Sequence, residues 1–292
     1  MTLFSVLRRW RRGAKVGVLF ATISALCAPV VALSSSVQAT DRPFAHAYER
    51  GTLIVGVPYV TPDPQAGAKI RTEERLDTKM AQTLGEQLGL PVRLLEVDAV
   101  RGRAAVSVGD IDVLLTDRIV PEASTRTALP VAEVSTGYVS RPKAIIRSDT
   151  PLRDWKDVAS MTVCMSSAAF LAKSLASQQG ATVRTYSVPS DALVAVRQGD
   201  CDIGVVDDVM WTALMTLPEW KNFSSTLNPV GPRAERVWVT DGHPTTRAWL
   251  DDAMSKWTRN GVLDEMVTQW ARDIAFDVYL DQEVPDCHTG LP

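Results

Sequence analysis

The sequence contains few of the residue types that mark metal proteins, disulfide-rich miniproteins or nucleic-acid-binding proteins. Its 292 residues include four cysteines and three histidines, and His46, His243 and His288 are too scattered for metal-ligand spacing. The formal net charge of −3 argues against nucleic acid or an anionic membrane surface as a partner. We therefore expect no metal, no cofactor and no nucleic-acid partner.

Long apolar runs are missing after residue 40, whereas the first 40 residues contain one. Five basic residues precede an apolar stretch at 16–33, and Val37 and Ala39 follow as small residues at the −3 and −1 sites. This three-part layout is typical of a secretory signal peptide. The alternative is a membrane anchor helix, which Pro29 disfavours. Cleavage near Ala39 would make the net charge −8 and place the mature protein in the periplasm.

From residue 50 onward, short apolar runs alternate with segments of helical periodicity, which is typical of an α/β protein with mostly parallel sheets. Leucine or methionine recurs every four residues over 76–88, the pattern of one helix face. The alternation restarts near Pro142, which predicts two similar lobes. We expect strands at 52–57, 92–97, 111–115, 162–165, 183–188, 202–206 and 235–240, and further helices at 168–178 and 191–198.

Two extended segments, 137–146 and 235–240, are expected to link the lobes. The C-terminal part contains two apolar helical stripes that Asn260 and Gly261 separate. The chain therefore divides into a signal peptide at 1–39, the first part of lobe 1 at 40–140, lobe 2 at 141–234, and a return to lobe 1 with the C-terminal helices at 235–292.

Seven segments stand out in order and spacing: TLIVGVPY (52–59), LDTKMAQTLGEQLGLPVRLLEV (76–97), VGDIDVLLTDRIVPEASTRTALPV (108–131), GYVSRPKAIIRSD (137–149), DVASMTVCMSSAAF (157–170), LVAVRQGDCDIGVVDDVMWTAL (193–214) and HPTTRAWLDDAMSKWTRNGVLDEMVTQW (243–270). Together they resemble the amino-acid-type family 3 periplasmic solute-binding proteins, which are the receptors of ABC importers. The resemblance covers about residues 48–272. It implies a type II, two-lobed Venus-flytrap fold with two crossing hinge strands and a ligand in the cleft.

The resemblance also implies a charged clamp for a zwitterionic solute. Asp207 corresponds to the family's ammonium-binding Asp, although Asp is also common as a turn residue at a strand end. A guanidinium could grip the carboxylate with two parallel hydrogen bonds. Arg126, two residues beyond the family's position, and Arg118, earlier in the same loop, are both candidates. Either one could instead be a solvated cation or an ion-pair partner.

Five other residues could contact the ligand. Thr116 and Asp117 belong to the same loop, and Ser166 and Ser167 replace the family's Gly-containing anion loop. Tyr59 could supply an aromatic wall. Leu76 replaces the aromatic residue that the family often has at a second position. The ligand therefore need not be a standard amino acid.

The resemblance places Cys164 and Cys201 on neighbouring strands, where some family members carry two cysteines. In an oxidising compartment we expect them to form a disulfide. Cys287 has no partner once Cys27 is removed with the signal peptide.

Taken together, these features favour a monomeric periplasmic binding protein without enzymatic activity. It would capture a small polar, amino-acid-like solute for an ABC-type membrane permease. One alternative is an exported accessory or sensor protein on the same fold. Another is a dehydratase-type enzyme, for which Asp117, Asp207 and Glu122 could act as acid or base. No histidine falls in the segments expected to form the cleft, which disfavours the enzyme.

Overall fold

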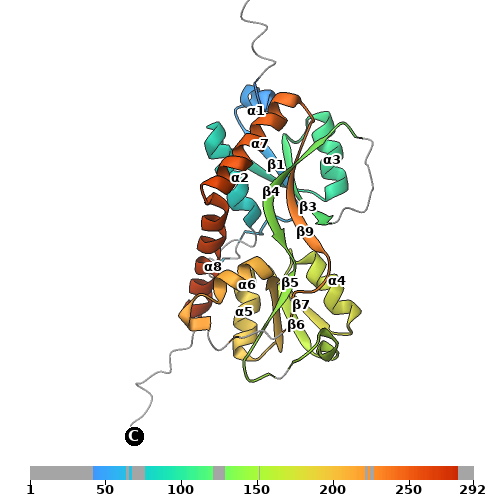
Figure 1. The fold of residues 1–292 in the computed structure, drawn as a ribbon, viewed down its shortest axis with the longest axis vertical. Helices are drawn as coiled ribbons and strands as arrows, with labels where there is room; N and C mark the ends of the chain where they lie inside the picture. The colour runs from blue at the N-terminus through green and yellow to red at the C-terminus, as the bar shows by residue number, and fades with distance from the viewer. Residues whose placement is uncertain are drawn as a thin grey trace, which may run out of the picture. The chain divides into compact units, whose positions relative to one another are not determined.

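The computed structural model describes residues 42–63, 66–67, 76–120, 129–150, 152–220, 223 and 227–281, and these form two α/β lobes (Figure 1). The predicted signal peptide, Arg126 and Cys287 lie outside the described residues. Within them, no helix has the length and apolar character needed to cross a membrane.

Lobe 1 contains a five-stranded sheet in the order β2-β1-β3-β9-β4. Strand β1 runs parallel to β2 and β3, whereas β9 runs antiparallel to β3 and β4. The strands are β1 (Leu53–Val57), β2 (Val92–Glu96), β3 (Val113–Val120), β4 (Ala132–Ser140) and β9 (Arg233–Thr240). The accompanying helices are α1 (Ala45–Arg50), α2 (Leu76–Leu88), α3 (Ala99–Val108) and α7 (Pro244–Arg259).

Lobe 2 contains a four-stranded sheet in the order β5-β8-β6-β7. Strand β6 is parallel to β7 and β8, and β5 is antiparallel to β8. The strands are β5 (Pro142–Ile146), β6 (Thr162–Ser166), β7 (Thr182–Tyr186) and β8 (Ile203–Asp207). The helices are α4 (Phe170–Gln178), α5 (Pro189–Gln198) and α6 (Asp208–Leu214), with 3-10 turns at Trp155–Val158 and Pro218–Trp220.

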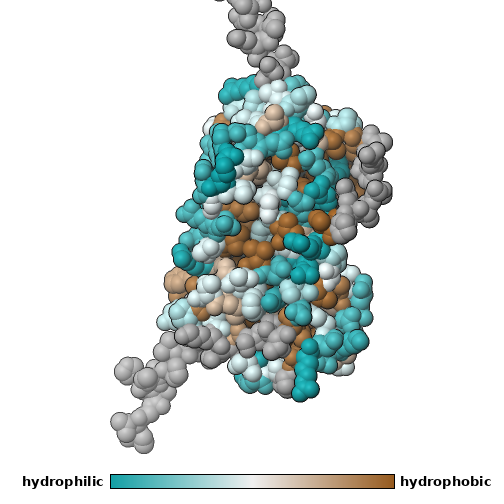
Figure 2. Space-filling view, in the orientation of Figure 1, coloured by the Kyte–Doolittle hydropathy of each residue, from teal (hydrophilic) through white to brown (hydrophobic). Residues whose placement is uncertain are grey.

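Two connections cross between the sheets, and the predicted two-lobed fold is confirmed. Strands β4 and β5 are separated by Arg141 alone, and β9 carries the chain back into the sheet of lobe 1. The amide of Val230, just before β9, donates to the carbonyl of Pro142 at 2.9 Å, so the two connections lie side by side. In the view of Figure 2, apolar residues gather in the middle of the visible face, between the lobes.

Helix α2 illustrates how local sequence produces an element. Its apolar positions at four-residue spacing, including Met80 and Leu84, are all buried in the core of lobe 1. The carboxylate of Asp77 lies in the first turn, where a negative charge is favourable. The helix ends before Gly89, which adopts a left-handed backbone conformation with φ of 67°.

The last helix, α8 (Val262–Leu280), packs into both lobes and runs alongside them in Figure 1. Its first half contributes Met266 and Val267 to the core of lobe 1. Its second half contributes Ala271, Ile274, Ala275 and Val278 to a cluster formed with β5, β8, α5 and α6 of lobe 2. Helix α8 is therefore shared by the two hydrophobic cores.

Two elements differ from the sequence expectations. Strand β3 continues to Val120, so Thr116, Asp117 and Arg118 belong to a strand and not to a loop, because β9 pairs with this extension along its whole length. Helix α3 was not expected, since its sequence lacks an apolar stripe and buries only Gly102 and Val106.

Candidate functional site

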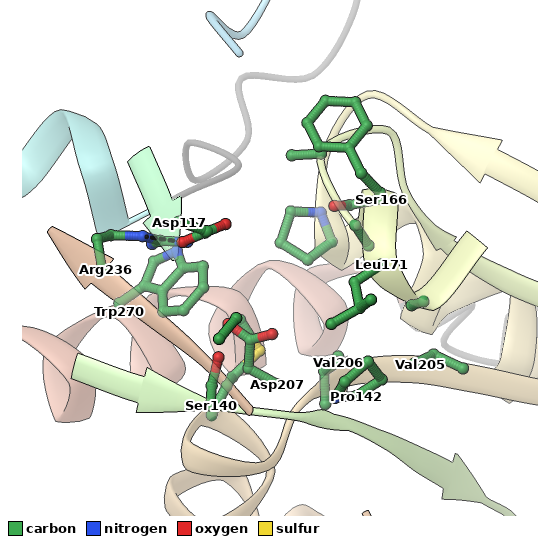
Figure 3. A pocket seen from close by; sticks show the side chains of 17 residues that line it. Asp117, Ser140, Pro142, Ser166, Leu171, Val205, Val206, Asp207, Arg236 and Trp270 are labelled. Atoms are coloured by element: carbon green, nitrogen blue, oxygen red, sulfur yellow. Dashed lines mark hydrogen bonds and ion pairs between the residues drawn. The ribbon is translucent and has the colours of Figure 1, made fainter. Parts of the chain in front are cut away.

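A pocket lies where the two lobes meet, and both lobes line it (Figure 3). It contains about 770 Å³ of empty space, including the part that opens to solvent. The polar lining residues are Asp117, Arg236, Ser140, Asp207 and Ser166. The apolar lining residues are Pro142, Ala168, Ala169, Phe170, Leu171, Ala172, Pro189, Val205, Val206, Met210, Ala234 and Trp270.

Arg236 is the charged centre of the lobe 1 side. Strand pairing places it directly opposite Asp117, and its side chain is only 7% exposed. Its Nη1 atom lies 2.7 Å from Asp77 Oδ1, and its Nε donates to Asp117 Oδ1 at 3.0 Å. The guanidinium also lies over the ring of Tyr138, with 5.2 Å between its Cζ atom and the ring centroid.

The surroundings of Arg236 determine its ionisation. Burial alone lowers the pKa of the guanidinium, but Asp117, Asp77, Tyr138 and Asp207 raise it, and the pKa ends above its ordinary value. Arg236 is therefore a permanent cation, held between two carboxylates of its own lobe. Among the described residues, no group of three or more histidine, cysteine, aspartate or glutamate side chains could hold a metal ion.

Asp207 ends β8 and faces the pocket from lobe 2. The hydroxyl of Tyr138, on β4 of lobe 1, donates to its Oδ2 at 2.9 Å. The neighbouring Asp208 has a different role, because it accepts a 2.9 Å hydrogen bond from the amide of Arg141 between β4 and β5. The two adjacent carboxylates thus differ in role: Asp207 lines the pocket, and Asp208 binds the connection between β4 and β5.

The segment between β6 and α4 forms much of the apolar wall. Its amides hydrogen-bond to backbone carbonyls: Ser167 donates to Tyr186 at 2.7 Å, Ala169 to Ser166 at 3.1 Å, and Phe170 to Ala168 at 2.9 Å. Ala169 begins α4 without a side-chain cap. These three amides are therefore already satisfied by the protein.

Of the predicted ligand contacts, Asp117, Asp207 and Ser166 line the pocket. Thr116 is buried in β3, and Ser167 is half-buried beside Ser166. Tyr59, also half-buried, donates to the carbonyl of Ser187 in lobe 2 at 3.3 Å. Arg126 and Glu122 lie outside the described residues.

Arg118 lies in a different network. Because side chains alternate along a strand, it points to the face of β3 opposite to Asp117. Its guanidinium donates to Glu235 at 2.6 Å and to Glu133 at 3.2 Å, and Glu133 also pairs with Arg103 of α3. Burial raises the pKa of Glu235, but hydrogen bonds from Arg118 and Ser135 lower it to below its ordinary value.

Three contributors to the pocket and its charge network were not identified from the sequence: Arg236, Tyr138 and Trp270. Arg236 begins RVWVT, the buried half of β9, and a charge next to a buried apolar run could have marked it. Trp270 carried no such signal. Trp211, the tryptophan nearest to Asp207 in sequence, instead packs with Lys143, whose Nζ atom lies 3.7 Å from its ring centroid.

The predicted Cys164–Cys201 disulfide is confirmed. Cys164 lies on β6 and Cys201 just before β8, with 6.0 Å between their Cα atoms. Both residues are buried in a small cluster with α5. The bridge closes a loop of 37 residues, which contains Ser166, Pro189 and other residues that line the pocket.

No protein-family model matches the chain, and no curated protein matches it either. Among solved structures, an ancestral cationic amino acid solute-binding protein aligns with a TM-score of 0.55 at 16% identity, over 78% of this chain and 98% of its own. A mutant of ArgBP from T. maritima aligns with a TM-score of 0.53 at 15% identity, over 78% and 98%. The solute receptor for L-cysteine of Neisseria gonorrhoeae aligns with a TM-score of 0.50 at 17% identity, over 83% and 97%.

These similarities agree with the geometry described above: two α/β lobes, two crossing connections, and a pocket lined from both sides. At identities this low, the similarity is evidence about the fold. The chain therefore has the two-lobed fold of the periplasmic solute-binding proteins.

Proposed function

We propose that this chain is an exported binding protein that captures a small, amine-bearing solute between its lobes and delivers it to an ABC-type permease. The observation that carries this proposal is a pocket lined by both lobes, to which each lobe contributes a carboxylate. The fold supports the proposal, because the structures it resembles are those of solute-binding proteins.

In this proposal Asp207 and Asp117 contact the ammonium group from opposite lobes, and Arg236 holds Asp117 in position. Each lobe alone then binds only part of the solute, so the solute favours the form in which the lobes are together. Ser140 and Ser166 supply neutral hydroxyl groups. We retain the prediction that the guanidinium of Arg126 binds any carboxylate that the solute carries.

The test is a thermal-shift screen of the chain from Thr40 onward against amino acids, amines and organic acids, followed by calorimetry. We expect Asp207→Asn to weaken binding of any amine-bearing hit by about 2–4 kcal/mol, roughly 30- to 1000-fold, because a desolvated ammonium loses its partner. Asp208→Asn is the matched control, since Asp208 is the next residue and does not line the pocket. Equal binding by the Asp207→Asn variant would contradict this site.

Export and transport are tested separately. Intact-mass measurement of periplasmic protein should give a chain that begins near Thr40, and a mass that retains the first 39 residues would contradict cleavage.

The solute-loaded protein should stimulate the ATPase activity of a reconstituted partner permease. The chain should bind its solute as a monomer and leave it chemically unchanged, so appearance of a product would favour the enzyme alternative.

A further inference from the structure

Helix α8 connects the two lobes a third time. It is continuous over 19 residues, Val262–Leu280, and its sequence contains neither glycine nor proline. Its first half packs into the core of lobe 1, where Met266 and Val267 are each only 6% exposed. Trp270, at its middle, packs against the hydrophobic clusters of both lobes. A single stiff element therefore reaches from one core into the other.

The second half of α8 is bound to lobe 2. Its buried side chains form one cluster with residues of β5, β8, α5 and α6, and they are Ala271, Ile274, Ala275 and Val278. The guanidinium of Arg197, in α5, also donates to the carbonyl of Val278 near the end of the helix. A cation is favourable at this end, because the helix dipole places partial negative charge there. This half follows 243–270, the last of the segments that resemble the solute-binding family.

The strands that cross between the lobes lie at a different place. Their two connections are held together by the hydrogen bond from the amide of Val230 to the carbonyl of Pro142. Two neighbouring connections define one axis about which the lobes can rotate. In Figure 1, β4, β5 and β9 run through the middle of the molecule, whereas α8 runs along its side. A rotation about the strands must therefore displace α8 relative to at least one lobe.

Each way of accommodating that displacement is unfavourable. If α8 stayed with lobe 1, Ile274 would lose its cover in lobe 2, and apolar surface would meet water. If α8 stayed with lobe 2, Met266 and Val267 would be exposed instead. Bending the helix at its middle would disturb its backbone hydrogen bonds where no glycine or proline eases a kink.

We propose that α8 is a brace, a stiff third connection that limits rotation of the lobes, so that the pocket is largely assembled before a solute binds. Wide opening then requires the last part of α8 to detach from lobe 2. A preassembled site loses less freedom when a ligand binds. The inference goes beyond the proposed function, because it concerns the motion of the chain without solute.

The experiment measures distances between the lobes in the chain from Thr40 onward, dialysed from urea to remove any bound solute. Nitroxide labels are attached at Val100→Cys in α3 and Lys173→Cys in α4, two exposed positions. Cys287→Ser leaves the two labelled cysteines as the reactive thiols. Pulsed electron paramagnetic resonance should give one narrow distance distribution for this labelled parent, and circular dichroism establishes that each variant is folded.

Two glycines at the middle of α8 are the direct test. Thr268→Gly with Gln269→Gly makes two exposed positions flexible and leaves the buried contacts of both halves in place. The ratio of long to short distances should rise by about tenfold or more, because the lobes are no longer joined by a stiff rod. Thr268→Ala with Gln269→Ala is the matched control. It removes the same side chains but keeps a strong helix former, so the distribution should not change.

A second variant keeps the helix stiff and weakens its contact with lobe 2. Ile274→Ala should shift the distances in the same direction as the glycine pair, and it decides the question if the glycine pair does not fold. Phe276→Ala, on the exposed face of the same helix, should leave the distances unchanged.

A broad distribution in the labelled parent would overturn the brace directly. The brace would also be wrong if the glycine pair and Ile274→Ala kept the parent distribution, or if the glycine and alanine pairs shifted it equally. Any of these results would leave the proposed solute capture intact, because a two-lobed protein that opens freely can also bind a solute.

Discussion

Lobe 1 presents charged side chains to the pocket, whereas lobe 2 presents mainly apolar ones. In lobe 1, Asp77, Asp117 and Arg236 form a network that is fixed by the pairing of β3 with β9. In lobe 2, the described residues of the wall are hydrocarbon apart from Asp207 and Ser166. A single site is thus divided between a side that provides charge and a side that provides apolar surface.

The lobes also differ in what stabilises them. Lobe 1 has five strands and a core that includes α2 and α7. Lobe 2 has four strands, a disulfide between β6 and the start of β8, and a core cluster that depends on residues from α8. The smaller lobe therefore relies on a covalent bridge and on a helix at the other end of the sequence, and this difference can be tested.

The largest effect is expected where charge is buried in lobe 1. Arg236→Met should lower the free energy of unfolding by about 3–5 kcal/mol, because the buried carboxylate of Asp77 would lose its partner, and Asp117 would lose it as well. The measurement is urea denaturation followed by circular dichroism.

Arg118→Met is the matched control, on the neighbouring strand and also between two carboxylates. Its side chain is partly exposed to solvent, so the loss should stay below about 1 kcal/mol. Adding Asp77→Asn to Arg236→Met should restore part of the stability. Similar losses for the two arginine variants would show that burial of the pair is not decisive.

The next effect concerns the bridge in lobe 2. Replacing Cys164 and Cys201 together by alanine should cost about 3–4 kcal/mol, because the 37-residue loop gains freedom in the unfolded chain. Urea denaturation with and without a reductant measures it. The reductant should destabilise the parent protein and leave the double variant unchanged; an equal response of both would argue against the bridge.

A somewhat smaller effect is expected from the shared helix. Ile274→Ala should cost about 3 kcal/mol, because Ile274 is fully buried in the cluster with lobe 2. Amide hydrogen exchange should rise in β5 and β8 more than in β1. Phe276→Ala, on the same helix but 59% exposed, should change stability by less than about 0.5 kcal/mol. Faster exchange confined to lobe 1 would contradict the role of α8 in lobe 2.

Elements with strong local patterns could be predicted from the sequence. The four-residue spacing over 76–88 produced a helix within one residue of its observed limits, and 53–57 is a fully buried strand. The two C-terminal helices separate at Asn260 and Gly261, where the glycine has φ of 69°. Asp207 could be predicted as a site residue only through the family resemblance, and it lines the pocket at the end of β8.

The rest depends on pairing between distant segments. Asp117 and Arg236 meet only because β9 returns to pair with β3, and the two residues are 119 positions apart in sequence. Trp270 reaches the pocket because α8 extends past the core of lobe 1. Neither contact can be predicted from the local sequence. Hydrophobic periodicity indicates which face of an element is buried, but not which partner covers that face.

Helix α8 also constrains the order in which the chain can fold. Its residues complete both hydrophobic clusters, and Ile274 contributes to the same cluster as Ile145, far earlier in the sequence. A chain threaded through a membrane from its N-terminus, as in the proposed export, would deliver α8 after every other described element. Until then, Ile145, Leu193 and Met210 would lack the helix that covers them, and closing such long loops is slow. Under the proposed export, final packing of both lobes would therefore wait until α8 has crossed the membrane.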